Sequence, residues 1–179
     1  MIWQKLAPHI KEERVPVGTD VSDARLIGVS NELGLHASSR STSADLSRYQ
    51  RIELNWFAYN PMRVNIGSIG LADTDEKTGI TSPDYTVFSC LDTLNPYYLL
   101  YYLTSEKGLD EIGRNCSGAV RKRLYYSGLS NINIPIPDLD EQQALVDKVF
   151  AVERIRDAFE SSRKKAEVLL QQVLKESFA

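Results

Sequence analysis

Residues 115–126 concentrate the residue types that bind polyanions. They contain three consecutive cations, preceded by a serine and a glycine. Lysine and arginine neutralise phosphates, arginine also pairs with guanine edges, and small residues let a backbone approach a nucleic acid closely. A solvated turn is the alternative explanation of such a triplet. The residues that we expect to contact DNA in this segment are Ser117, Gly118, Arg121, Lys122 and Arg123.

A second candidate surface lies nearer the N-terminus. Residues 31–47 are rich in serine and threonine and show almost no apolar periodicity, so they predict an irregular loop. Long loops in compact domains often carry function, although a plain surface connection is the alternative. Arg40 and Arg48, in the stretch from residue 36 to residue 51, are the candidate DNA-binding residues of this surface.

The charge distribution shows that positive charge is local. The chain has 179 residues, with 21 Lys and Arg, 24 Asp and Glu, and a net charge of −3. Residues 141–179 carry seven charges of each sign, so the whole negative excess belongs to residues 1–140. Residues 114–123 nevertheless hold four cations and no acid. The sequence therefore argues against an indiscriminate polyanion binder and predicts a local basic contact.

Catalytic and cofactor chemistry finds little support in the sequence. Residues 95–98 differ from the Asn-Pro-Pro-Tyr loop of amino-group DNA methyltransferases, and no glycine-rich cofactor loop precedes them. Gly67 and Gly70 are too sparse for a phosphate loop and predict a tight turn or a bulge. His9 and His36 have no nucleophile context and are too few for a four-ligand structural zinc site. We expect no enzyme, cofactor or metal site; a stand-alone methyltransferase or nuclease is the competing hypothesis.

Composition favours a cytoplasmic protein. No stretch approaches the roughly eighteen consecutive apolar residues of a transmembrane helix. The N-terminus does not have the charged and then apolar pattern of a signal peptide. Two cysteines, Cys90 and Cys116, fit a reducing compartment and cannot form a disulfide scaffold.

The elements that must position these residues indicate an α+β fold, with a small mixed β-sheet and packed helices. Apolar or alternating runs predict strands at 25–30, 51–59, 64–72, 85–91 and 130–137, while residues 3–13 are either a short helix or the start of a strand. Residues 95–108 predict a helix with Asn95 as N-cap, a proline in the first turn and Gly108 at its end. We expect its four tyrosines to pack against the sheet.

A long amphipathic helix is predicted from residue 140 to the end of the sequence. Apolar residues recur at spacings of three and four, without glycine or proline, and Asp140 with Gln143 resembles a capping box. Such a helix would be about 55–60 Å long. One small domain cannot cover that length, so part of the apolar stripe needs another helix, as in a coiled coil. We therefore expect two copies of the chain to pair through residues 140–179.

Four segments form an ordered set in the last two thirds of the chain. They are Trp56–Gly70 (WFAYNPMRVNIGSIG), Gly79–Phe88 (GITSPDYTVF), Ser117–Arg123 leading into Leu129–Pro137 (LSNINIPIP), and Asp140–Gln143 (DEQQ). This set resembles the target-recognition domain of the specificity subunit of type I restriction–modification systems. Residues 3–13 also resemble the start of that domain. For Arg63 and Asn65, within the first segment, we expect a structural role.

The resemblance implies a DNA-gripping globule, residues 1–139, followed by a long helix, residues 140–179, that spaces domains and docks methyltransferase subunits. It implies a non-catalytic, sequence-specific subunit that directs a partner adenine methyltransferase, and a restriction subunit where one exists, to an interrupted target on double-stranded DNA. We expect it to act as a homodimer.

One departure from the family and two alternatives remain open at this point. Typical specificity subunits carry two recognition domains and two long helices, whereas this chain has one of each, so it looks like a half-size subunit or one half of a longer one. The alternatives are a protein-interaction adaptor that does not bind DNA, and the specificity subunit of a type IIB-like or IIG-like modification system.

Overall fold

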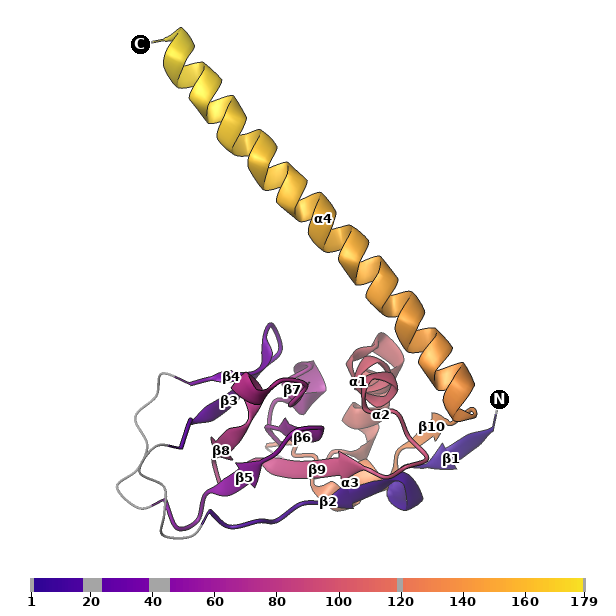
Figure 1. The fold of residues 1–179 in the computed structure, drawn as a ribbon. Coiled ribbons are helices and arrows are strands. Elements are labelled where there is room, and N and C mark those ends of the chain that lie inside the picture. The colour runs from indigo at the N-terminus through magenta and orange to yellow at the C-terminus, as the bar shows by residue number, and fades with distance from the viewer. Residues whose placement is uncertain (1, 18–23, 39–45, 119–120, 179) are drawn as a thin grey trace. The chain divides into compact units, whose positions relative to one another are not determined.

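The computed structural model describes residues 2–17, 24–38, 46–118 and 121–178, and it confirms the α+β class (Figure 1). The chain divides into two compact units. Met1–Gln142 contains every described strand and all the short helices, and Gln143–Ala179 continues one long helix. The described candidate DNA-binding residues all belong to the first unit, so its sheets and loops position them.

A four-stranded antiparallel sheet forms the centre of the first unit. Phe57 and Phe88 are register partners on its two middle strands, and their stacked rings have centroids 4.7 Å apart. Both side chains are fully buried. Such cross-strand aromatic pairs stabilise a sheet because they remove large apolar surfaces from water. The strand order is β2 (Ile10–Glu12), β9 (Thr86–Cys90), β6 (Trp56–Tyr59) and β7 (Ile69–Leu71).

Three two-stranded antiparallel ladders accompany this sheet. They are β1 (Trp3–Lys5) with β10 (Asn133–Pro135), β3 (Ile27–Ser30) with β4 (Gly34–Ala37), and β5 (Gln50–Ile52) with β8 (Gly79–Thr81). A single parallel bridge joins Leu26 to Ile80. β4 packs closely against β7: a Cβ atom at Gly70 would lie 2.4 Å from the Leu35 nitrogen. Gly70 therefore permits this close approach of two backbones.

Several strands are shorter than the sequence predicts. Residues 31–47 were expected to be irregular, but a turn at 31–33 brings β4 back to pair with β3. Residues 51–59 form two strands instead of one, because Asn55 takes a φ of 65° between them. Residues 64–72 begin with the 3₁₀ helix η2 (Val64–Ile66), which ends at Gly67 in the predicted tight turn. The other 3₁₀ helices are η1 (Ala7–His9) and η3 (Asp75–Lys77).

Helix α1 (Pro96–Thr104) begins as predicted and ends earlier. The Asn95 Oδ1 accepts hydrogen bonds from the backbone N–H groups of Tyr97 and Tyr98 at 2.9 and 3.3 Å. Ser105 ends this helix and caps α2 (Glu106–Asn115), because its Oγ accepts from the Gly108 N–H at 3.1 Å. Gly108 therefore lies inside α2, and the prediction that it closes the first helix is wrong.

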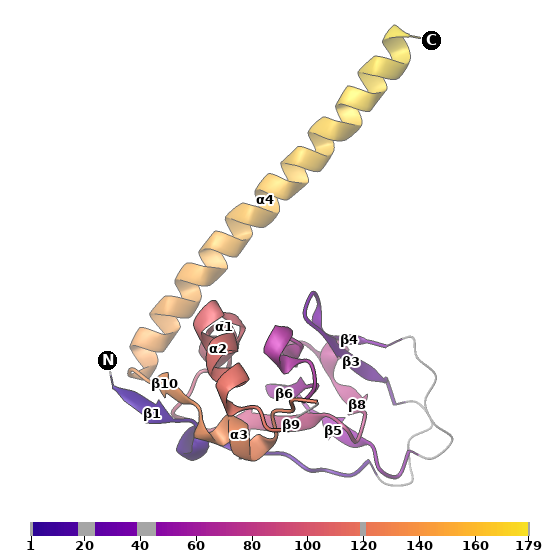
Figure 2. The same ribbon diagram turned by 180° about the vertical axis from the view of Figure 1, so that it is seen from behind.

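The short helices lie side by side in the first unit. α1 contacts α2 and β7, and α2 contacts α3 (Tyr126–Asn131). The three helices can be followed in the view from behind (Figure 2). Tyr98 is buried and donates its hydroxyl proton to the Pro135 carbonyl at 2.7 Å. This tyrosine has the packing role that was predicted, and its hydrogen bond ties α1 to β10.

The long helix α4 (Leu139–Ser177) has 39 residues, as the sequence pattern predicts. Asp138 caps it: its Oδ1 accepts from the Glu141 N–H at 2.9 Å. The expected cap at Asp140 is therefore wrong by two residues, because Asp140 is already helical. No helix among the described residues is both long enough and apolar enough to cross a bilayer.

A buried glutamine fixes the first turn of α4 to the loop before α1. Gln142 is completely buried. Its Oε1 accepts from the Asn95 N–H at 2.7 Å, and its Nε2 donates to the carbonyls of Thr93 and Pro137 at 3.1 and 2.9 Å. These bonds satisfy backbone groups on both sides of the junction, which a buried polar side chain must do to be stable.

Replacing Gln142 by alanine is therefore expected to lower the free energy of unfolding by about 3 kcal/mol, because three part-buried backbone groups lose their partner. Urea denaturation followed by circular dichroism measures the change. Gln143→Ala is the matched control, since Gln143 is exposed, and it should change stability by less than about 0.5 kcal/mol. Equal losses in the two variants would contradict the anchoring role.

Candidate nucleic-acid interface

A backbone bridge pairs Ser117 with Arg123, and the described residues Ser117, Gly118 and Arg121–Arg123 are called the basic loop below. The Ser117 N–H donates to the Arg123 carbonyl at 2.9 Å, and the Arg123 N–H donates back to the Ser117 carbonyl at 2.8 Å. Gly118 has a φ of +109°, and a Cβ atom there would lie 2.5 Å from the Arg121 carbonyl oxygen. The geometry thus gives Gly118 a conformational role, since only glycine adopts this backbone without strain.

The loop is fixed to the body of the first unit at its end. Leu124, the next residue, is completely buried, and its N–H donates to the Pro61 carbonyl at 3.0 Å. Arg121 and Lys122 are exposed, and Arg123 is half-buried. Among the described residues, no ion pair or side-chain hydrogen bond reaches any of these three cations. The positive charge of the loop is thus available to a partner.

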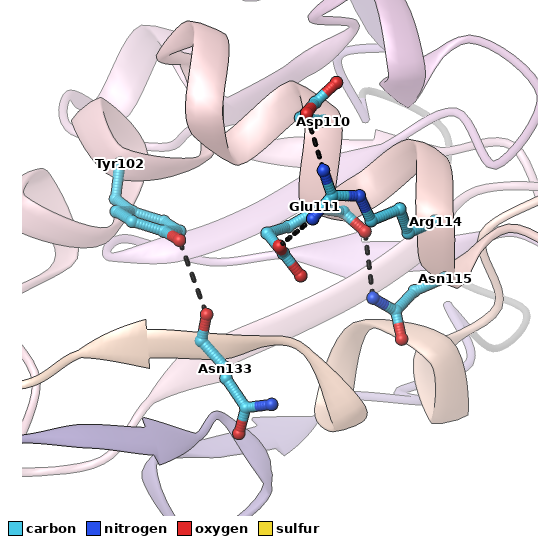
Figure 3. A network of polar contacts seen from close by, with 6 residues as sticks. All are labelled: Tyr102, Asp110, Glu111, Arg114, Asn115 and Asn133. Carbon is cyan, nitrogen blue, oxygen red and sulfur yellow. Dashed lines mark hydrogen bonds and ion pairs between the residues drawn. The ribbon is translucent and has the colours of Figure 1, made fainter.

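Arg114 does not share this availability, although the sequence counts it in the same basic segment. Its guanidinium forms ion pairs with Asp110 and Glu111, each at 3.0 Å (Figure 3). The neighbouring Asn115 Nδ2 donates to the Glu111 carbonyl at 2.9 Å, inside the same helix. Arg114 therefore belongs to the i,i+3 and i,i+4 charge pairing of α2, and the free cations of the segment are Arg121, Lys122 and Arg123.

A groove of about 590 Å³ brings the two predicted basic surfaces together. Arg123 of the basic loop lines it together with Arg48, which belongs to the stretch from residue 36 to residue 51, called the polar loop below; 75 residues separate the two arginines in sequence. We call this concavity the first groove. The other predicted residue of that loop, Arg40, lies outside the described residues. The remaining lining residues are Glu12, Arg14, Pro16, Ser47, Tyr49, Gln50, Pro61, Met62, Pro83, Asp84, Tyr85, Thr86 and Tyr125.

Sequence reasoning missed several side chains of the first groove. Arg14 adds a third cation, although Glu12 pairs with it at 2.8 Å. Tyr49, Tyr85 and Tyr125 supply aromatic and hydroxyl groups. Only Tyr125 had a signal, its position directly after the basic segment. Tyr49 directly precedes β5 and Tyr85 directly precedes β9, so no sequence spacing connects them before the chain is folded.

A second groove, of about 480 Å³, adjoins the first and shares Tyr49, Met62 and Tyr85 with it. Among the residues that the structure describes, no carboxylate lines the second groove. Arg63 lines the second groove, and its guanidinium has no partner among the described residues. Its backbone carbonyl accepts hydrogen bonds from the N–H groups of Ile66 and Ser68. The other lining residues are Leu26, Ile27, Gly28, Val29, Ser30, His36, Ser38, Asn60 and Ser82.

The cysteines are not prepared for nucleophilic chemistry. Burial raises the pKa of the Cys90 thiol to about 12. Burial also raises the pKa of the Cys116 thiol, and nearby Lys122 opposes this shift only in part. Reactive cysteines need a depressed pKa. Within the described part of the chain, no group of three histidine, cysteine or acidic side chains is placed to hold a metal ion.

Comparison with known families and structures gives a consistent match. A family model described as type I restriction modification DNA specificity domain matches residues 55–170, more than half of the chain. None of the curated proteins matches the chain in sequence.

Three solved structures are similar in fold. The HsdS subunit from Thermoanaerobacter tengcongensis has 22% identity and a TM-score of 0.70, over 98% of this chain and 48% of that one. A chain from a study of complex assembly and conformational transition of the type I R-M system has 21% identity and a TM-score of 0.68, over 99% and 49%. The S subunit of a type I restriction–modification system from M. genitalium has 13% identity and a TM-score of 0.58, over 86% and 39%. This chain thus spans about half the length of the first two.

Proposed function

Since the chain belongs to the family of type I restriction modification DNA specificity domains, we propose that its first unit recognises double-stranded DNA and that the chain directs an adenine methyltransferase to a specific sequence. A restriction subunit would join the same complex where the system has one. The family is the non-catalytic, DNA-recognition part of these systems, as the sequence predicts. The two unpaired cysteines fit action in the cytoplasm.

One observation carries the proposal: the basic loop and Arg48 meet at the first groove. Phosphate contacts supply most of the affinity of DNA-binding proteins, and they require cations that internal carboxylates do not neutralise. Arg121, Lys122 and Arg123 satisfy this condition among the described residues, whereas Arg114 does not. The DNA-contacting residues that we propose are Ser117, Gly118, Arg121, Lys122, Arg123 and Arg48, with Arg40 of the same polar loop.

Co-expression with the methyltransferase subunit of the same system tests this function. We expect the two proteins to purify together, and we expect sequencing of the methylated DNA to reveal one recurrent sequence. Stable co-purification without any methylated site would favour the adaptor that does not bind DNA. A methyltransferase and nuclease fused in one partner chain would favour the type IIB-like or IIG-like alternative.

We also propose that two copies pair through α4. In the single chain, Val152, Ile155 and Phe159 are exposed at helical spacing, and this apolar stripe continues to Val173. An isolated helix with such a stripe gains stability from packing against another helix. A two-fold dimer presents two identical DNA-binding units, which would read the same half-site twice, in inverted orientation, around an unread spacer.

The geometry of the basic loop leads to a further test. Gly118→Val is expected to weaken DNA binding about tenfold, because a β-branched residue at a φ of +109° strains the loop that presents the cations. Titration of a fluorescent duplex measures the affinity. Gly113→Val in α2 is the control, since a Cβ atom there has open space around it. Unchanged binding by the Gly118 variant would show that the loop conformation is unimportant.

A further inference from the structure

The residues that line the second groove differ in whether the family model matches them. One wall consists of β3 and β4, residues 27–37, which precede the part that the family model matches. Asn60, Met62 and Arg63 on the other side lie inside that part. The solved structures cover 98% and 99% of the chain, so they share the fold of the first wall as well. The β3–β4 wall therefore combines a fold that the similar structures share with a segment that the family model does not match.

This combination is suited to sequence recognition. Proteins that use one fold to recognise different DNA sequences keep their backbone-positioning contacts and change the side chains that meet base edges. The basic loop lies inside the matched region and offers charge, which is suited to phosphates. A side chain that contacts a base edge should then lie on β3 or β4. It should carry a directional hydrogen-bonding group and be held rigidly.

His36 on β4 meets these three requirements. Its Nδ1 lies 3.1 Å from the Gly34 carbonyl oxygen. A carbonyl oxygen only accepts hydrogen bonds, so Nδ1 carries the proton, and Nε2 of the neutral ring is left as an acceptor. No hydrogen bond from a described residue reaches Nε2. The ring is partly buried on a paired strand and lines the second groove.

Gly28 on the neighbouring strand makes room for this ring. Gly28 and His36 are register partners, and a Cβ atom at Gly28 would lie 3.3 Å from the His36 Nε2. This contact would be tight, so a larger residue at Gly28 must displace the imidazole. The absence of a side chain at this position therefore helps to set where Nε2 stands.

The chemistry of an acceptor selects among bases. In the major groove, adenine N6 and cytosine N4 are the amino groups that donate hydrogen bonds, whereas guanine and thymine present acceptors at the corresponding positions. A phosphate oxygen is also an acceptor and would be repelled by the Nε2 lone pair. An acceptor without a described partner, on a residue that lines the groove, is therefore suited to an amino-bearing base and unsuited to the DNA backbone.

We infer that His36 is a specificity-determining residue whose Nε2 accepts a hydrogen bond from the exocyclic amino group of an adenine or cytosine in each half-site. This inference rests on the proposed function and adds to it a division of labour. The basic loop holds phosphates, and the β3–β4 wall of the second groove reads a base.

The test compares sequence selection by the wild type and by His36→Phe, which keeps a flat ring and removes the acceptor. The full chain, with its co-expressed methyltransferase subunit, selects from a pool of random-sequence duplexes, and the bound DNA is sequenced. We expect the variant to lose about fivefold or more of the preference for adenine or cytosine at one position of each half-site. Affinity for non-specific DNA and its salt dependence should stay unchanged, because no phosphate contact is lost.

Two further variants protect the result against an indirect explanation. Gly28→Val keeps the histidine at position 36 but shifts its imidazole ring. It should therefore cause the same loss of preference at the same position of the half-site. Glu32→Gln alters an exposed residue of the turn between β3 and β4 that lines neither groove, and it should keep that preference. Thermal melting establishes that each variant is folded.

The outcomes separate this inference from the proposed function. If the wild type selects a sequence and both His36→Phe and Gly28→Val select the same one, the role of His36 is wrong and the proposed function stands. A uniform loss of affinity with a flatter salt dependence in His36→Phe would assign His36 to the backbone instead and would also overturn the inference. If the wild-type complex selects no sequence, the proposed function and this inference fall together.

Discussion

Changing Arg121, Lys122 and Arg123 to alanine together is expected to weaken duplex DNA binding about 100-fold in ~0.1 M salt. Each cation that neutralises a phosphate releases about 0.9 of a counterion, so the slope of log K against log salt concentration should become shallower by about 2.7. The described residues give none of the three an internal ion pair. Anisotropy titrations of a labelled duplex at several salt concentrations measure both quantities.

The fold should survive this triple substitution. The Ser117–Arg123 bridge uses backbone groups alone, so alanine at position 123 preserves it. Far-UV circular dichroism should therefore be unchanged. A control that removes the same charge from residues lining neither groove should bind within about threefold of the wild type. Unaltered affinity in the loop variant, or an equal loss in the control, would refute the assignment of the loop. The control residues are Lys5, Lys107 and Arg114.

Placing glutamate at Ile155 and Phe159 is expected to abolish pairing of the chain. These side chains are 71% and 70% exposed in the single chain, one turn apart on α4. Burying each in a helix–helix interface contributes about 1.5–3 kcal/mol. Four such side chains in a dimer amount to at least about 6 kcal/mol, so their loss should raise the dissociation constant by about 10⁴-fold or more. Sedimentation at micromolar protein distinguishes the dimer from the monomer.

The control for this variant keeps the apolar stripe and alters the opposite side of the helix. Asp157 and Lys164 are seven residues apart, and helical periodicity places both away from Ile155 and Phe159. Asp157→Lys with Lys164→Glu should sediment like the wild type. A wild-type chain that stays monomeric, alone and with its methyltransferase subunit, would refute the dimer. A methylated sequence without inverted half-sites would contradict two identical, two-fold related DNA-binding units.

The sequence by itself determined the features that depend on neighbouring residues. The N-cap at Asn95 and the length of α4 follow from local hydrogen bonding and from a helical period that 39 residues repeat. The concentration of charge at residues 121–123 is likewise visible without a fold. The ends of helices were less well determined by the sequence, because alternative N-cap residues differ little in free energy. Asp138 caps α4, although Asp140 has the same side chain.

Only the tertiary structure decided which residues act together. Arg123 of the basic loop lines a groove together with Arg48, although 75 residues separate them in sequence. The pairing of Arg114 with Asp110 and Glu111 is different, because it follows from helical spacing within α2. His36 appeared in the sequence as a histidine without context. The pairing of β3 with β4 places its ring beside Gly28, and both residues line the second groove. The physical reason is that charge and hydrogen bonding depend on distances across the fold, which sequence spacing does not encode.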